Sequence, residues 1–156
     1  MLIVIAGERC TGKSALARAI MEKIHAEFFA GRDYVRLAPT EPEAVDRFQC
    51  LLAEKQRSED YLIFLLPEPD LFALVPPGSF VVMCRCRLET SKARFAKQMP
   101  DGELSPSIAA MLERQRGCFN HIPHSLTLDT DGADLSLLAV EVLEQAEELR
   151  KQESKV

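Results

Sequence analysis

Residues 2–14 read Leu-Ile-Val-Ile-Ala-Gly-Glu-Arg-Cys-Thr-Gly-Lys-Ser, and this stretch decides the fold. The apolar run Leu2–Ala6 is typical of a short buried strand. The eight residues that follow match the spacing G-x-x-x-x-G-K-[ST] position by position. Such a loop wraps a phosphate with its backbone N–H groups, and Gly7 and Gly12 provide the close approach that a Cβ would block. The stretch therefore predicts a phosphate-binding loop between a strand and a helix.

The side chains of this Walker A loop have separate expected roles. Lys13 would reach the β and γ phosphates of a nucleotide, and the Ser14 hydroxyl would bind Mg²⁺. The helix that follows points its positive amino-terminal end at the same phosphates. Arg9 and the field of the loop would lower the pKa of the Cys10 thiol. The residues expected to bind the nucleotide here are Gly7, Glu8, Arg9, Cys10, Thr11, Gly12, Lys13 and Ser14.

The rest of the chain alternates short apolar runs with helical periodicity. The expected strands are Leu2–Ala6, Tyr34–Leu37, Tyr61–Leu66, Phe80–Cys84 and Leu126–Leu128. The expected helices are one that follows the loop, with Leu16, Ile20, Ile24 and Phe28 on one stripe, then about Glu41–Ser58, Leu88–Gln98, Ser107–Asn120 and Leu135–Lys151. This alternation predicts an α/β fold of three layers, α/β/α, around a mainly parallel five-stranded sheet. Ligands would bind at the carboxyl ends of the strands.

Length and composition set the class of protein. A chain of 156 residues predicts a single domain over residues 1–156, with a short lid at about 98–120 and a frayed tail at about 151–156. The content of hydrophobic residues, 47%, and of charged residues, 28%, is that of a globular protein. The net charge of -5 disfavours nucleic acid as a partner.

The apolar runs and the cysteines give an expected location. The longest apolar runs are far shorter than the roughly 20 residues of a membrane span, so we expect no membrane insertion. Five cysteines without C-x-x-C spacing are typical of reduced thiols. Met1 leads directly into the first strand without a basic segment, which also favours a cytoplasmic location.

Other classes of nucleotide-binding protein fit the chain poorly. Reading a guanine base usually takes Asn-Lys-x-Asp, but the single asparagine, Asn120, is followed by His121. The chain is too short for an AAA-type ATPase, and it lacks the Leu-Ser-Gly-Gly-Gln signature of transporter ATPases. The small-molecule kinases remain.

The sequence resembles the small P-loop nucleotide and metabolite kinases, of the cytidylate, shikimate and adenylate kinase kind. Besides the phosphate loop, Phe80–Met99 is similar to the family's strand followed by an arginine-bearing helix, and Leu126–Asp131 to its final strand and the turn near the adenine. The resemblance implies a P-loop NTPase type of fold with ATP as donor, Arg94 against the adenine or a phosphate, and Thr130 in the adenine turn.

The resemblance also implies a lid whose arginines close on the transferring phosphoryl group, and Arg114 and Arg116 are the candidates. Arg85 and Arg87 leave the end of a strand, where substrate anions would be expected, although solvated side chains fit equally well. Relatives such as adenylate kinase carry a second arginine four residues after the first, and here Gln98 takes that place.

An acidic residue after the third strand should hold Mg²⁺ through water or accept the proton of the substrate. Glu68 and Asp70 are the candidates for both catalysis and metal binding. Glu68 is favoured slightly because it is nearer the end of the strand. The alternative is a solvated turn, in which Pro and Asp are common residues.

These observations predict an ATP- and Mg²⁺-dependent phosphotransferase. It would move the γ-phosphate to a small acceptor, either a nucleoside monophosphate or a hydroxylated metabolite, as a monomer or homodimer. The expected catalytic residues are Lys13, Arg94, Arg114, Arg116 and Glu68, and the expected metal ligands are Ser14, Glu68 and Asp70. The alternative is a nucleotide-binding regulatory or assembly module with little or no kinase activity. Gln98 and the Pro67–Asp70 segment keep that alternative open.

Overall fold

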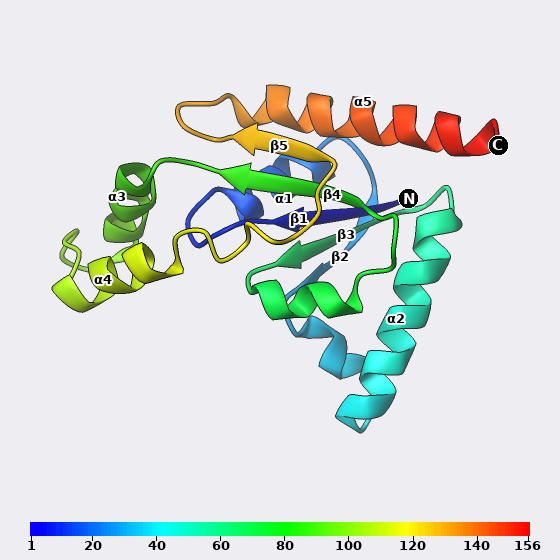
Figure 1. Cartoon of the computed structure of the whole chain (residues 1–156), viewed down its shortest axis with the longest axis horizontal. Helices are drawn as coiled ribbons and strands as arrows, with labels where there is room; N and C mark the ends of the chain where they lie inside the picture. The colour runs from blue at the N-terminus through cyan, green and yellow to red at the C-terminus, as the bar shows by residue number, and fades with distance from the viewer.

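The computed structural model describes residues 1–156 and is built on one five-stranded sheet, shown in Figure 1. The strands are β1 (Leu2–Ala6), β2 (Ala26–Ala30), β3 (Tyr61–Leu66), β4 (Phe80–Arg85) and β5 (Leu126–Asp129). They lie in the order β2-β3-β1-β4-β5, and every neighbouring pair is parallel. Ala6 pairs with both Leu66 and Met83, so the phosphate loop leaves the centre of the carboxyl edge.

Helices cover both faces of the sheet, which confirms the expected three layers. The α-helices are α1 (Lys13–Met21), α2 (Glu41–Arg57), α3 (Leu88–Gln98), α4 (Pro106–Gln115) and α5 (Leu135–Ser154), and two 3₁₀ helices are η1 (Asp33–Leu37) and η2 (Pro69–Leu74). On one face, Ile3 and Ile5 of β1 pack in the cluster that includes α1 and α5. On the other face, Leu2 and Val4 pack in the cluster that includes α2, η1 and η2. Alternate residues of the central strand thus serve two separate cores.

The second strand lies earlier in the chain than the sequence predicts, because α1 ends at Met21 and β2 begins at Ala26. Ile24 and Phe28 are four positions apart, which fits one stripe of a helix. An interval of four also keeps two residues on one face of a strand, since side chains alternate with a period of two. Phe28 packs against one core and Phe29 against the other, as a strand requires.

The expected strand Tyr34–Leu37 is wrong, because these residues lie in η1. Tyr34 is buried, and its ring stacks on that of Phe48 at a centroid distance of 5.2 Å. The apolar character that suggested a strand therefore comes from one aromatic anchor. A single buried side chain carries no periodicity from which a strand and a helical turn can be told apart.

Two helix boundaries also differ from the expected ones. Helix α4 ends at Gln115 instead of Asn120, and Gly117 just beyond it has a φ of 85°. A left-handed residue at this place is a common way to end a helix. Helix α5 continues through Ser154, so the segment expected to be frayed from residue 151 is helical there.

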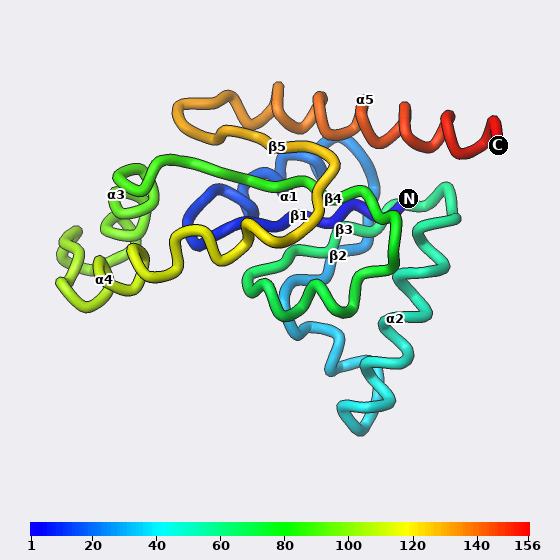
Figure 2. Tube along the Cα trace, in the orientation of Figure 1, coloured from blue at the N-terminus to red at the C-terminus, as the bar shows by residue number.

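Helices α3 and α4 project beyond the carboxyl edge of the sheet, in the region where a lid is expected (Figures 1 and 2). The chain passes from β4 into α3 and returns through α4 to β5, as Figure 2 shows. An ion pair of 2.7 Å between Lys92 and Glu113 joins the two helices. Both termini lie at the opposite side of the molecule (Figure 2). None of the helices has the length and apolar character that crossing a membrane requires.

Candidate functional site

The phosphate loop is held close to the neighbouring strand. Gly7 has a φ of 147°, and a Cβ there would lie 2.4 Å from the carbonyl oxygen of Cys84 in β4 and 2.9 Å from Thr11 Oγ1. Gly12 has a φ of 92° and forms the N-cap of α1. Thr11 Oγ1 donates to the carbonyl oxygen of Glu8 at 2.7 Å, which closes the loop on itself. Both glycines are therefore needed where the spacing places them.

Lys13 lies folded into the loop. Its Nζ donates to the carbonyl oxygens of Gly7 and Glu8, both at 2.7 Å, and only 8% of the residue is exposed. Burial lowers the pKa of Lys13. Ser14, in the first turn of α1, is exposed. The ammonium group is thus positioned within the loop before any phosphate arrives.

A cleft of about 700 Å³ opens beside the loop. Its wall contains Arg9, Cys10, Gly12, Lys13, Ser14, Ala15, Arg18, Leu65, Pro67, Arg94, Lys97, Gln98, Thr130, Gly132, Ala133 and Leu135. Five of these residues are basic and none is acidic, although the whole chain carries a net charge of -5. The cleft is therefore a local basic site on an acidic protein, and it suits a polyphosphate.

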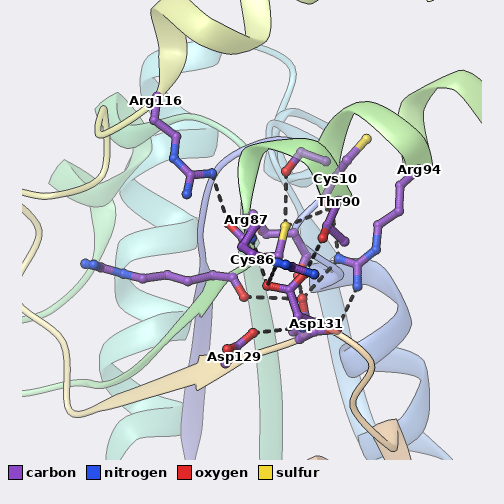
Figure 3. A network of polar contacts seen from close by, with 12 residues as sticks. Cys10, Cys86, Arg87, Thr90, Arg94, Arg116, Asp129 and Asp131 are labelled. Carbon is purple, nitrogen blue, oxygen red and sulfur yellow. Dashed lines mark hydrogen bonds and ion pairs between the residues drawn. The ribbon is translucent and has the colours of Figure 1, made fainter.

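Arg94 ties α3 to the phosphate loop and to the turn after β5 (Figure 3). Its Nη1 donates to the carbonyl oxygen of Cys10 at 3.1 Å and to Thr130 Oγ1 at 3.0 Å, and its Nη2 donates to the carbonyl oxygen of Thr130 at 2.7 Å. The Thr130 hydroxyl in turn donates to the carbonyl oxygen of Thr11 at 2.7 Å. The structure thus brings Arg94 and Thr130 together with the loop, in the wall of the cleft.

The turn after β5 also holds the beginning of α3, as Figure 3 shows. Asp131 accepts hydrogen bonds from the backbone N–H of Arg87 at 2.8 Å and from the hydroxyl of Thr90. The Thr90 hydroxyl, more than any other group, lowers the pKa of Asp131. Asp129 accepts from the backbone N–H of Asp131 at 2.8 Å. The helix that carries Arg94 is therefore anchored at its first turn.

A smaller cleft of about 300 Å³ lies on the other side of the loop, lined by Glu8, Arg85, Cys86, Arg116, Gly117 and Asn120. Arg116 Nη1 donates to the carbonyl oxygen of Cys86 at 2.9 Å, and Glu8 Oε1 accepts from the backbone N–H of Gly117 at 3.2 Å. A narrow crevice shares Glu8 and Arg116 with this cleft and Arg9 with the larger one. The phosphate loop therefore forms the partition between two clefts.

Three of the residues expected from the sequence to act line neither cleft. Glu68 and Asp70 follow β3 and are exposed, and neither lines either cleft. Leu65 and Pro67 from the same segment line the larger cleft instead. The lid candidate Arg114 is exposed on α4 and lines neither cleft. The roles of Glu68, Asp70 and Arg114 stay predictions.

Cys10 has an environment that the sequence does not suggest. It is the one non-glycine residue with a positive φ, 59°. Burial raises the pKa of its thiol and outweighs the charges of Arg9 and Lys13, which act in the other direction. The expected lowering is therefore wrong, because neighbouring cations do not compensate for the loss of water around a half-buried sulfur. The Cys86 thiol donates to the Cys10 carbonyl oxygen at 3.8 Å.

Some residues of the two clefts are missed by sequence reasoning. Arg18 carries a usable signal, because it follows Ser14 by four positions and so lies one helical turn further along α1. Gly117 and Asn120 carry none, since they lie in an irregular segment that approaches the loop only through the tertiary fold. Lys97 lines the larger cleft beside Gln98 and supplies a cation next to the position where the adenylate kinases carry an arginine.

The three-layer fold around a central phosphate loop is that of the small P-loop kinases. A gluconokinase from Sinorhizobium meliloti has 18% identity and a TM-score of 0.60, and the match covers 96% of this chain and 95% of that one. A shikimate kinase from Acinetobacter baumannii, in complex with shikimate, has 14% identity, a TM-score of 0.62 and coverage of 92% and 91%.

An uncharacterized protein from Eubacterium ventriosum has 12% identity, a TM-score of 0.65 and coverage of 94% and 98%. These similarities extend over nearly the whole chain and establish the fold. No protein-family model and no curated protein matches the sequence.

Proposed function

We propose that this protein is an ATP- and Mg²⁺-dependent phosphotransferase that moves the γ-phosphate to a small acceptor, a hydroxylated metabolite or a nucleoside monophosphate. The observation that carries the proposal is the pair of clefts separated by the phosphate loop. One cleft is lined by five cations and contains the buried Lys13, and the other combines two arginines with Glu8. The solved structures with this fold include a gluconokinase and a shikimate kinase in complex with shikimate, which supports a small acceptor here.

The larger cleft would hold the nucleotide. Its polyphosphate would enter the loop, where the ammonium of Lys13 would exchange the carbonyl oxygens of Gly7 and Glu8 for phosphate oxygens. Thr130 and Arg94 would lie beside the base or the sugar, near the turn after β5. Phosphoryl transfer depends mainly on positioning and on neutralising charge, and a cleft of this composition supplies both.

The fit of Mg²⁺ can be judged from the oxygen atoms near the loop. Ser14 offers an exposed hydroxyl beside Lys13, and the larger cleft contains no carboxylate. The structure has no cluster of three or more His, Cys, Asp or Glu residues suited to a metal. Mg²⁺ commonly keeps several water ligands and binds through substrate phosphates. Ser14, whose hydroxyl lies next to Lys13 in the loop, would thus bind the metal, and the metal would help to neutralise the phosphates.

The smaller cleft would hold the acceptor. Arg85 is exposed and makes no hydrogen bond or ion pair through its side chain, so its guanidinium is available to an anionic group. Arg116 donates one N–H to the carbonyl oxygen of Cys86, and its other N–H groups can bind an anionic group of the acceptor. Helices α3 and α4 project beyond the carboxyl edge of the sheet (Figure 1), and a closing movement of these helices would bring Arg114 toward the site. A lid of this kind would exclude water from the transfer.

The proposal is tested by following ADP release from Mg²⁺-ATP in the presence of single acceptors. Gluconate, shikimate, deoxyadenosine, AMP and CMP cover hydroxyl and phosphate acceptors. We expect at least one of them to accelerate ADP release well above the rate in buffer. Binding of Mg²⁺-ATP by calorimetry without acceleration by any acceptor would contradict the proposed transfer.

The second candidate is a regulatory or assembly module that binds a nucleotide and hardly turns it over. It is favoured by the absence of Glu68 and Asp70 from both walls, because these are the carboxylates expected to assist transfer. The same acceptor screen separates the two functions. A module would bind Mg²⁺-ATP and leave ADP production independent of every acceptor.

A further inference from the structure

We propose that Glu8, within the phosphate loop, accepts the proton of the acceptor, and that the acceptor therefore reacts through a hydroxyl group and not through a phosphate. This inference rests on the proposed phosphotransfer and names the chemistry of its acceptor. It assigns to the loop a role in proton transfer besides the binding of the nucleotide.

The position of Glu8 favours this role. It follows Gly7, so its backbone belongs to the loop that would hold the γ-phosphate, and its carbonyl oxygen accepts from Lys13 Nζ at 2.7 Å. The residue lines the smaller cleft and the crevice but not the larger cleft. In the proposed arrangement, Glu8 would therefore adjoin both the phosphate held by the loop and the acceptor.

The carboxylate is oriented and still has a free oxygen. Oε1 accepts a hydrogen bond from the backbone N–H of Gly117 at 3.2 Å, whereas Oε2 has no hydrogen-bond partner. The residue is partly exposed, so the cleft reaches it. One oxygen is therefore used for positioning and the other is available to a ligand, as a general base requires.

No other carboxylate competes for this role. Glu8 is the single acidic residue in the walls of the two clefts and the crevice. Strand β3 ends in Leu66, and Glu68 and Asp70 beyond it are exposed outside these walls. Asp131 is nearer the loop but is occupied by the backbone N–H of Arg87 and the hydroxyl of Thr90.

The charge of the cleft selects the chemistry of the acceptor. An alcohol must lose a proton as its oxygen bonds to phosphorus, so a nearby carboxylate assists it. A phosphate acceptor is already ionised, gains nothing from a base and would be repelled by Glu8. Arg85 and Arg116 in the same cleft would bind an anionic group elsewhere on the molecule. The class that fits is a hydroxylated compound that carries an acid group.

The hydroxyl oxygen of the acceptor forms a bond to the γ-phosphorus, and the bond from that phosphorus to the β,γ-bridging oxygen breaks. The bridging oxygen leaves with the electron pair as part of ADP. The proton of the hydroxyl passes to Oε2 of Glu8 and then to solvent through the open cleft.

Glu8→Gln tests the role because it removes the basic oxygen and keeps the fold. The amide oxygen of glutamine can still accept from the N–H of Gly117, so we expect an unchanged melting temperature. With gluconate or shikimate as acceptor, kcat should fall about 100-fold. The KM for Mg²⁺-ATP should not rise, because the variant removes a negative charge beside Lys13. Transfer to water, measured without acceptor, should fall as well.

The dependence of kcat on pH separates a general base from a structural residue, because replacing a structural residue should not change the shape of the pH profile. The wild type should lose activity at acid pH, and Glu8→Gln should lack this acid limb. Glu8→Asp should restore part of the rate. Glu141→Gln, which removes an exposed carboxylate on α5, is the matched control and should behave as wild type.

Two results would overturn the assignment. One is a Glu8→Gln enzyme with wild-type kcat and the wild-type pH profile, since the transfer would then need no base at this position. The other is stimulation of the wild type by AMP or CMP and by none of the hydroxyl compounds. A wild type that binds Mg²⁺-ATP and transfers to neither acceptors nor water contradicts the proposed function itself, so the two failures are distinguishable.

Discussion

The two sides of the phosphate loop differ in how their charged side chains are held. On the side of the larger cleft, Lys13 and Arg94 both donate to backbone carbonyl oxygens of the loop. On the side of the smaller cleft, Arg85 makes no hydrogen bond through its side chain, and Arg116 makes one, to the carbonyl oxygen of Cys86. The cations that reach the phosphates on the first, organised side are therefore fixed before a ligand binds, whereas Arg85 on the second side is left free for the acceptor.

The largest effect is expected from Lys13→Ala, on the organised side. Removing the ammonium from the loop should lower acceptor-dependent ADP release about 1,000-fold, since preorganised charge is a major term in such transfers. The fold should persist, because the variant buries less charge than the wild type. ADP release and circular dichroism measure the two expectations.

The matched control for this variant is Lys151→Ala, which removes an exposed ammonium at the far end of α5. It should leave ADP release unchanged. A Lys13→Ala enzyme with near wild-type turnover would show that the organised side does not carry the transfer.

The next largest effect is expected from Arg94→Ala. The guanidinium donates to the carbonyl oxygens of Cys10 and Thr130, and hydrogen bonds from charged groups contribute roughly 2 kcal/mol. The melting temperature should therefore fall by about 4–8 °C. Affinity for Mg²⁺-ATP should also fall, because the larger cleft loses one of its five cations. Calorimetry and thermal unfolding measure these changes. Arg94→Lys should recover little of the loss, because an ammonium lacks the fork of donors that spans both carbonyl groups.

Arg85→Gln makes the comparison between the two sides direct. The side chain of this arginine makes no hydrogen bond or ion pair, so its loss should leave the melting temperature and the affinity for Mg²⁺-ATP unchanged. The KM for the acceptor should rise. If Arg85→Gln destabilised the protein as much as Arg94→Ala, the proposed contrast between an organised side and a free side would be wrong.

The same contrast explains which parts of the site can be predicted from the sequence. Gly7, Gly12 and Lys13 are local in sequence, and their spacing alone predicts the loop. The hydrogen bond between Glu8 and Gly117 joins residues 109 positions apart, and no local sequence pattern around either residue predicts it. Arg94 is predicted to lie at the nucleotide, but its bonds to backbone carbonyl groups are visible only when α3 and the loop are placed together.

The fold follows the same division between local and long-range information. Four of the five strands lie close to where the apolar runs predict them. The misplaced one, β2, is a short strand in which Phe28 fits a helical stripe equally well. What decides in favour of the strand is its pairing with β3, in which Phe28 lies opposite Ile63. Long-range pairing of this kind overrides local periodicity.

A smaller effect is expected at the opposite edge of the sheet, far from the loop. The hydroxyl of Tyr61, at the beginning of β3, donates to Glu147 in α5, and Arg150 donates to both oxygens of the same carboxylate. The Tyr61 hydroxyl is the main cause that lowers the pKa of Glu147. Glu147→Gln should lower the free energy of unfolding at pH 7 by about 1 kcal/mol and leave turnover unchanged.

The pH dependence follows from the direction of this shift. A carboxyl whose pKa is lowered in the folded state stabilises the protein above its ordinary pKa, and the contribution is lost as the pH falls through the folded value. The difference in unfolding free energy between wild type and Glu147→Gln should therefore shrink in acid. Urea unfolding between pH 3 and pH 7 measures it, in steps of about one unit. A difference that stays constant over this range would contradict the assignment.

The smallest effect is expected from Cys10→Gly, inside the organised side itself. Cys10 has a φ of 59°, and a left-handed conformation costs a residue with a Cβ roughly 1–2 kcal/mol. Glycine removes that cost but loses about 0.5–1 kcal/mol more backbone entropy on folding. The net gain should be under about 1 kcal/mol, which corresponds to a rise in melting temperature of about 2 °C. Affinity for Mg²⁺-ATP should persist, because the carbonyl oxygen of residue 10 still accepts from Arg94.

Cys50→Ser, at an exposed cysteine in α2, is the control for removing a thiol. A clear fall in melting temperature for Cys10→Gly alone would mean that packing of the half-buried sulfur outweighs the backbone strain, and that the loop depends on this side chain for its order.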